Sequence, residues 1–165
     1  MTPSILHAAF DLFNFCIPLH AAMWALFSVA FFTFLRKSNL VPDNTRQISS
    51  KVITGANLVF TSAGAYIHVS ATKTTQCQQR SLILPIPAIP GCRLCLILAV
   101  RRHLAINPGP VSAPLFSGFS GLDLAPITYK QFCVFLSRVL SKFHLDPALY
   151  SPHSFCRGGA TFAFD

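Results

Sequence analysis

The sequence contains no glutamate and only five aspartates in 165 residues. Because it also contains 13 lysines and arginines, its formal net charge at pH 7 is +8 and its isoelectric point is about 9.6. So little negative charge favours a polyanionic partner, either a nucleic acid or an anionic membrane surface. The net charge alone does not choose between these two partners.

Charge of either sign is also scarce, since charged residues make up 11% of the chain and hydrophobic residues 52%. This composition excludes a disordered basic tail, and it is unusual for a soluble protein with a fully formed surface. The length suits one domain with a real core, spanning residues 1–165. Part of the apolar surface is expected to contact a segment that is missing from this chain.

The six cysteines lack the regular spacing of a disulfide framework, and no signal peptide with a basic first region precedes them. We therefore expect an intracellular chain with reduced thiols. Cys92 and Cys95 form a lone C-x-x-C without a second pair at zinc-site spacing. The favoured interpretation is two buried cysteines at the start of a helix, and neither a metal nor a cofactor is expected.

Residues 17 to 35 form a mostly apolar stretch that ends at Arg36 and Lys37. Its length and its positive flank would suit a membrane-spanning helix. Pro18 and His20 lie inside the stretch, however, and a helix buried at the centre of a domain has the same hydropathy. We favour the buried helix and keep a small membrane-associated protein with a spanning helix at 17–35 as the alternative.

Hydrophobic spacing and turn residues predict an α+β fold that is mostly helical and has a small antiparallel sheet of three strands. Pro, Gly, Asn and Asp mark the turns between the elements. The predicted helices span 3–15, 19–35, 92–104 and 128–143, with a last one from His153, and the predicted strands span 57–61, 65–72 and 80–86.

Four segments carry a resemblance to a known family. In chain order they are Trp24 to Pro42 (WALFSVAFFTFLRKSNLVP), Tyr66 to Thr75 (YIHVSATKTT), Pro114 to Phe116 (PLF) and His153 to Thr161 (HSFCRGGAT). In this order they resemble the catalytic domain of tyrosine recombinases, the phage-integrase family, most closely the branch carried by eukaryotic mobile elements. The resemblance implies DNA recombination and integration, double-stranded DNA as partner, assembly of full-length relatives as oligomers on DNA, and a nuclear location in a eukaryote.

The resemblance also implies a catalytic set. Cleavage of DNA by a tyrosine without a metal requires protein cations and hydrogen bonds around the phosphate, and the planar fork of arginine grips two of its oxygens. Arg36 matches the first catalytic arginine, Lys73 the hairpin lysine that protonates the leaving 5′ oxygen, and His153 the histidine that positions the phosphate. The candidate contacts to DNA phosphates are Arg36, Lys37, Lys73 and Arg157.

The chain departs from the family at Cys156, where the second catalytic arginine is expected one turn after His153. A thiol cannot replace a bidentate cation. Arg157 is adjacent but is turned by about 100° around the helix, so it is a weak substitute. Gly158 and Gly159 fit a close approach of the backbone, either to DNA or to a neighbouring helix.

The tyrosines Tyr66, Tyr129 and Tyr150 all precede the histidine motif, and none matches the nucleophile of the family. The resemblance leads us to expect a partial catalytic domain that lacks the N-terminal DNA-clamping domain and the C-terminal nucleophile segment. Strand cleavage should then fail, leaving at most weak, salt-sensitive DNA binding. Two origins stay open, a relic that only holds DNA and a fragment of a longer enzyme.

Overall fold

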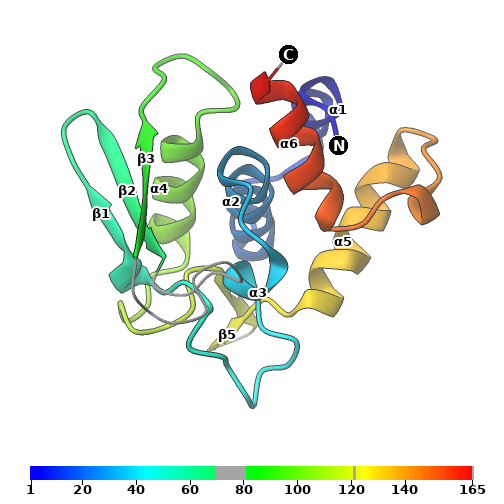
Figure 1. Cartoon of the computed structure of the whole chain (residues 1–165). Coiled ribbons are helices and arrows are strands. Elements are labelled where there is room, and N and C mark those ends of the chain that lie inside the picture. Colours follow the sequence, from blue (N-terminus) through cyan, green and yellow to red (C-terminus); the bar gives the residue numbers. More distant parts are fainter. Residues whose placement is uncertain (70–80, 121, 165) are drawn as a thin grey trace.

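The computed structural model describes residues 1–69, 81–120 and 122–164 (Figure 1). Within these ranges the fold is α+β and mostly helical, which confirms the fold class predicted from the sequence. The helices and strands are α1 (Pro3–Ala9), α2 (Pro18–Thr33), α3 (Lys37–Leu40), β1 (Leu58–Phe60), β2 (Gly64–Val69), β3 (Leu82–Pro87), α4 (Leu96–Ile106), β4 (Ser117–Ser120), β5 (Asp123–Pro126), α5 (Tyr129–Lys142) and α6 (His153–Phe164). Short 3-10 turns lie at Phe10–Leu12, Gly55–Asn57 and Pro147–Leu149.

The apolar stretch 17–35 forms α2, which lies at the centre of the molecule (Figure 1). Pro18 begins the helix, where its missing N–H costs no hydrogen bond. From Ala21 to Phe31 every residue is buried, because α4, α6 and β4 pack around it. In the part of the chain that the structure describes, no helix combines the length and the apolar character needed to cross a membrane.

The predicted three-stranded sheet is present, with β2 in the middle and both pairings antiparallel. Ala65, Ile67 and Val69 alternate along β2 and are buried, so this face of the sheet contributes to the core. Pro85 and Pro87 lie on the edge strand β3, where the missing backbone donor is tolerated.

Three expectations about element bounds were wrong. The first helix ends at Ala9 rather than at 15, because the chain tightens into the 3-10 turn and becomes extended at Phe13. The helix expected from residue 92 begins at Leu96, after a turn in which the Cys95 N–H donates to the Cys92 carbonyl. Between the predicted helices 92–104 and 128–143, where no strand was expected, β4 pairs with β5 in a two-stranded hairpin.

An aromatic cluster fixes α5 and α6 against α2. The Phe27 ring of α2 lies 4.8 Å from the Phe155 ring of α6 and 5.5 Å from the Phe132 ring of α5, between ring centroids. Phe132 and Phe155 are themselves 5.6 Å apart, and all three side chains are fully buried. Each such ring pair stabilises the fold by about 0.5–1.5 kcal/mol beyond the contribution from burying the ring surfaces. This cluster packs the first turns of α5 and α6 against α2.

Gly158 and Gly159 allow α6 to approach its neighbours closely. A Cβ atom on Gly159 would overlap the carbonyl oxygen of Phe31 in α2, and one on Gly158 would overlap the carbonyl oxygen of Met1. The glycine pair therefore serves contacts within the protein, one of the two interpretations left open by the sequence.

His103 links three elements in the interior. Its Nε2 lies 2.7 Å from the Leu115 carbonyl oxygen, and its Nδ1 lies 3.1 Å from the Asn107 side-chain nitrogen. Since the carbonyl only accepts, Nε2 carries the proton and Nδ1 accepts from the amide of Asn107. That amide also donates to the Pro18 carbonyl at 3.0 Å, so the network joins the end of α4 to the start of α2. Burial lowers the pKa of His103 despite the opposing hydrogen bond to Leu115.

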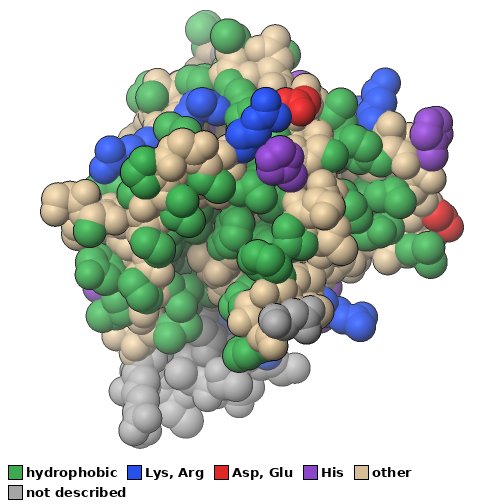
Figure 2. Space-filling model, turned by 90° about the horizontal axis from the view of Figure 1, so that it is seen from above, with side chains coloured by type: hydrophobic (Ala, Val, Ile, Leu, Met, Phe, Trp, Pro, Cys, Tyr) green, Lys and Arg blue, Asp and Glu red, His purple; other side chains and the backbone are tan. Residues whose placement is uncertain are grey.

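Apolar side chains remain exposed on part of the surface. Figure 2 shows hydrophobic side chains over much of the upper face, with lysine and arginine side chains towards its edge and few acidic ones. On α6 the exposed fractions of Phe162 and Phe164 are 56% and 88%, and that of Leu149 nearby in the chain is 78%. Exposed apolar groups of this kind favour association.

We expect Gly159→Ala to lower the free energy of unfolding by about 1–3 kcal/mol, because the new methyl group must displace the Phe31 backbone. Urea unfolding followed by circular dichroism measures the change. The matched control is Gly118→Ala, whose Cβ would make only ordinary contacts at 3.7 Å or more. Equal stability of the two variants would contradict the tight contact between α6 and α2.

We expect the free energy of unfolding to fall as the pH drops below about 6.5, the histidine pKa in the unfolded chain. The folded pKa of His103 is lower, so the unfolded state binds more protons in this window. The neutral His103 therefore makes its full contribution to stability above about pH 6.5. This contribution is lost as the pH falls towards the pKa of His103 in the folded protein. His20, whose pKa burial also lowers, adds to the same slope.

Urea titrations at several pH values measure this slope in wild type and in His103→Gln, which should flatten it. His7→Gln, at an exposed position of α1, is the control and should leave the slope unchanged. A slope that is the same in His103→Gln and in wild type would contradict the assignment.

Candidate functional site

Arg36 lies in the turn between α2 and α3. Phe34 ends α2 in the left-handed conformation, with φ of 56°, and turns the chain away from the helix axis. Leu35 is buried and anchors the turn, whereas Arg36 is exposed. No described residue forms an ion pair or hydrogen bond with the guanidinium of Arg36, so its donors are available to a ligand.

A pocket of about 380 Å³ opens beside this turn. Arg36, Lys37 and Ser38 line one wall, Tyr129 at the start of α5 contributes to a second, and His153 and Cys156 of α6 line the third. The fold thus brings Arg36, Lys37 and His153 together from distant parts of the sequence. Their participation in catalysis stays a prediction.

His153 is the first residue of α6, and its side chain is exposed. Pro152 before it is buried, and the hydroxyl of Ser154 accepts a hydrogen bond from the Ser151 N–H at 3.1 Å. These contacts fix the start of α6. His153 is thereby held on the backbone beside the pocket that it lines.

Cys156, one turn after His153, also lines the pocket and is half-buried. Its thiol donates to the Phe34 carbonyl, with 3.1 Å between sulfur and oxygen. That carbonyl lies at the end of α2, where the regular helical pattern stops. Cys156 thus ties α6 to the turn that carries Arg36, but it adds no positive charge to the pocket.

The positive charge of Lys37 is partly balanced by neighbouring side chains. Its Nζ lies 3.0 Å from a carboxylate oxygen of Asp43 and 4.2 Å from the centre of the Tyr129 ring. The side chains of Lys37 and Asp43 are 48% and 76% exposed, so water and salt weaken this ion pair. Lys37 therefore contributes less free positive charge to the pocket than Arg36 does.

Tyr129 is a pocket residue that the sequence analysis missed as a site residue. It begins α5 directly after the cap Thr128, and its backbone N–H donates to the Pro42 carbonyl at 2.9 Å. Burial and the interaction with Cys133 raise its pKa, against the opposing effect of Lys37. At neutral pH the phenol is protonated and can donate a hydrogen bond. The capping pattern in the sequence locates the helix start, but nothing in the sequence relates Tyr129 to Arg36.

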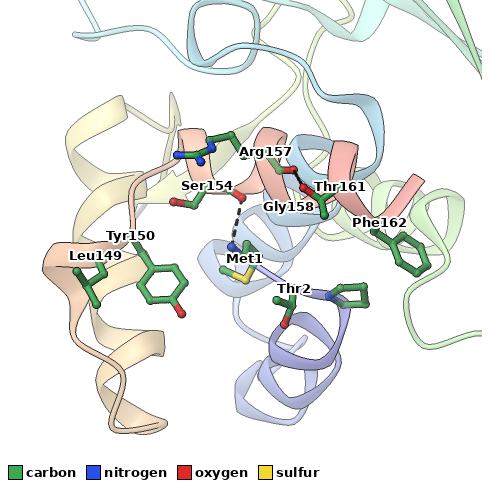
Figure 3. A pocket seen from close by; sticks show the side chains of 10 residues that line it. Met1, Thr2, Leu149, Tyr150, Ser154, Arg157, Gly158, Thr161 and Phe162 are labelled. Carbon is green, nitrogen blue, oxygen red and sulfur yellow. Dashed lines mark hydrogen bonds between the residues drawn. The ribbon is translucent and has the colours of Figure 1, made fainter. Parts of the chain in front are cut away.

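Arg157 lies at a different pocket of about 510 Å³, whose lining includes Met1, Tyr150 and Gly158 (Figure 3). The α-amino group of Met1 donates to the Ser154 carbonyl at 3.3 Å. Burial and the positive charge of Arg157 lower the pKa of that amino group. Arg157 is therefore not among the residues that line the pocket of Arg36 and His153.

Two further expectations concern Lys73 and a metal. Lys73 falls in residues 70–80, outside the described residues. Within the described ranges no group of three or more metal-ligating side chains comes together. In the C-x-x-C, Cys95 is buried, Cys92 is half-buried and both thiols are free. The sulfur of Cys95 accepts a hydrogen bond from the Ile89 N–H at 3.4 Å.

Comparisons of the chain with protein-family models, with curated proteins and with solved structures find no match.

We expect Tyr129 to titrate above its ordinary value of about 10. Subtracting the absorbance titration of Tyr129→Phe near 295 nm from that of wild type isolates its phenolate. Lys37→Met should raise the Tyr129 pKa further, because the charge that favours the phenolate is removed. A pKa of Tyr129 at or below 10 would contradict the packing described for this wall of the pocket.

Proposed function

We propose that the chain binds double-stranded DNA by holding a backbone phosphate in the pocket of Arg36 and His153, and that it does not cleave the strand. The observation that carries this proposal is the pocket of about 380 Å³ in which the side chains of Arg36 and His153 converge. The resemblance to tyrosine recombinases supports the same assignment. The net charge of +8 favours association with a polyanion.

The donors in this pocket suit a phosphate group. Arg36 offers a planar fork without a partner among the described residues, and Tyr129 adds a hydroxyl that also interacts with Cys133. His153 adds an imidazole that can donate through a ring nitrogen. Asp43, the acidic residue nearest to these groups by contact, pairs with Lys37 and is not part of the pocket lining. The described lining therefore offers donors to an anion, and the nearby Asp43 carboxylate is paired with Lys37.

Binding without cleavage follows from the chemistry of two positions. Cys156 supplies a neutral thiol where the resemblance implies a second arginine, so less charge is available to stabilise the transition state. Tyr129 is the one tyrosine that lines the pocket, and its raised pKa disfavours the phenolate that would attack phosphorus. The pocket would consequently bind a phosphate without cleaving the DNA strand.

The test measures the affinity for a labelled duplex by fluorescence anisotropy over a range of salt concentrations. Arg36→Gln should weaken binding about tenfold to a hundredfold, since a hydrogen bond to a charged group contributes about 1.5–3 kcal/mol. It should also reduce the slope of log affinity against log salt by about 0.9. Arg138→Gln, an exposed arginine of α5, is the matched control and should change neither quantity substantially.

Cys156→Arg should strengthen binding and increase the salt slope, because it adds a cation to the same wall of the pocket. Cys156→Ser is its control, since a hydroxyl can keep the hydrogen bond to Phe34 without adding charge. Equal affinity of Arg36→Gln and wild type would overturn the binding site. A covalent adduct with a nicked suicide duplex that is lost in Tyr129→Phe would overturn the claim that cleavage is disabled.

A further inference from the structure

Another pocket, also of about 380 Å³, has a polar lining and adjoins α3 through Asn39. The side-chain nitrogen of Asn39 donates to the Lys51 carbonyl at 3.2 Å, and the Asn39 carbonyl accepts from the Ile53 N–H at 2.8 Å. The lining of this pocket includes Ser49, Lys51, Thr54, Asn57, His68 and Ser112. The pocket of Arg36 and His153 lies at the start of α3, and this pocket adjoins the other end of the same short helix.

Among the residues that the structure describes, the lining of this pocket is rich in hydrogen-bond donors and includes no acidic residue. Lys51 supplies an ammonium group and His68 an imidazole, and neither side chain has an ion pair or hydrogen bond among the described residues. Ser112 and Thr54 add hydroxyl groups. Two basic groups without a carboxylate to balance them favour an anion as the ligand.

The amide of Asn57 is oriented by its own contacts. Its Oδ1 accepts from the Thr54 N–H at 2.7 Å and from the Thr54 hydroxyl at 3.0 Å. The oxygen of the amide is thereby occupied, so the Nδ2 group is the part left to donate. No described residue accepts from it. The contact with Thr54 thus orients the Asn57 side chain so that its amide nitrogen is the group left to donate. An anion requires such a donor.

The backbone beneath these side chains is held by a dense set of hydrogen bonds. The Leu115 N–H donates to the Ile53 carbonyl at 2.8 Å, and Thr54 forms a bridge with Pro114. The Gly55 N–H donates to the Ala113 carbonyl at 3.2 Å. Lys51, Thr54 and Asn57 therefore lie on a preorganised segment, which reduces the entropy cost of binding a ligand.

We propose that this pocket, with Lys51, Asn57 and His68 as donors, is a second phosphate-binding site that takes another backbone phosphate of the DNA held at Arg36. The inference rests on the proposed DNA binding. The helix α3 between the pockets has four residues and a length of about 6 Å. Arg36 precedes α3, and Asn39 within it contacts the backbone of Lys51 and Ile53, so the two pockets adjoin the same short helix. Phosphates a few nucleotides apart on one strand are the proposed ligands of the two pockets.

The test uses the full chain and compares the salt dependence of duplex binding in three variants. Lys51→Gln removes the ammonium charge and should reduce the salt slope by about 0.9. Asn57→Asp keeps an oxygen for the Thr54 contacts but presents a carboxylate in place of the donor, so it should weaken binding at least tenfold. Lys142→Gln, at an exposed position on α5, is the control and should leave the slope unchanged. Thermal unfolding of each variant establishes that its fold is intact.

A second arm titrates inorganic phosphate and follows the side-chain amide signal of Asn57 by NMR. Perturbation of this signal together with reduced salt slopes in Lys51→Gln and Asn57→Asp supports the second DNA contact. Perturbation with unchanged DNA binding in both variants assigns the pocket to a free phosphate ligand and overturns the DNA contact.

The outcomes for the two sites are separable. If Arg36→Gln weakens DNA binding and the two pocket variants do not, the second site is overturned and the first one stands. If Lys51→Gln and Asn57→Asp weaken it while Arg36→Gln does not, the first site is overturned. Weak binding that no variant changes would overturn both.

Discussion

The burial of α2 on every side is the constraint on which the rest of the structure depends. A helix whose residues from Ala21 to Phe31 are all buried must be surrounded, so the remaining elements are arranged as a shell around it. Its C-terminal end lies at the surface, and there the positive φ of Phe34 sends the chain outwards. The exposed Arg36 therefore lies two residues after Phe34, beyond the end of the buried helix, in a turn anchored by the buried side chain of Leu35.

The pocket at Arg36 forms where α5 and α6 pack against the central helix α2. The contact of Phe27 with Phe132 and Phe155 packs the first turns of α5 and α6 against α2, and the hydrogen bond from Cys156 to Phe34 brings α6 to the end of α2. Gly159 then permits a backbone approach that a side chain would prevent. The donors converge because the ends of three helices meet, so core packing and pocket geometry cannot be changed independently.

Several features could be predicted from the sequence because they depend on local patterns. The apolar run gives α2, the alternation of residues gives β2, and the Thr128 cap gives the start of α5. The hairpin of β4 and β5 could not be predicted, since its strands have four residues each and include glycine and proline. The position of Tyr129 and the pairing of Lys37 with Asp43 were missed because they arise only when distant segments pack together. The family resemblance implied a catalytic set of Arg36, Lys73 and His153, and the fold places Arg36 and His153 at one pocket.

Cys156 illustrates how one position can separate binding from chemistry. A thiol that donates to the Phe34 carbonyl holds α6 against the Arg36 turn, so the pocket keeps its shape without an arginine there. The ground-state phosphate needs only modest positive charge, whereas a transition state with more charge on its oxygens needs more. Under the proposed function, a pocket with Arg36 intact and a thiol at Cys156 would therefore hold the ground-state phosphate better than the transition state. If a second phosphate is held near Lys51, the additional affinity is also gained in the ground state, and it strengthens DNA binding without accelerating cleavage.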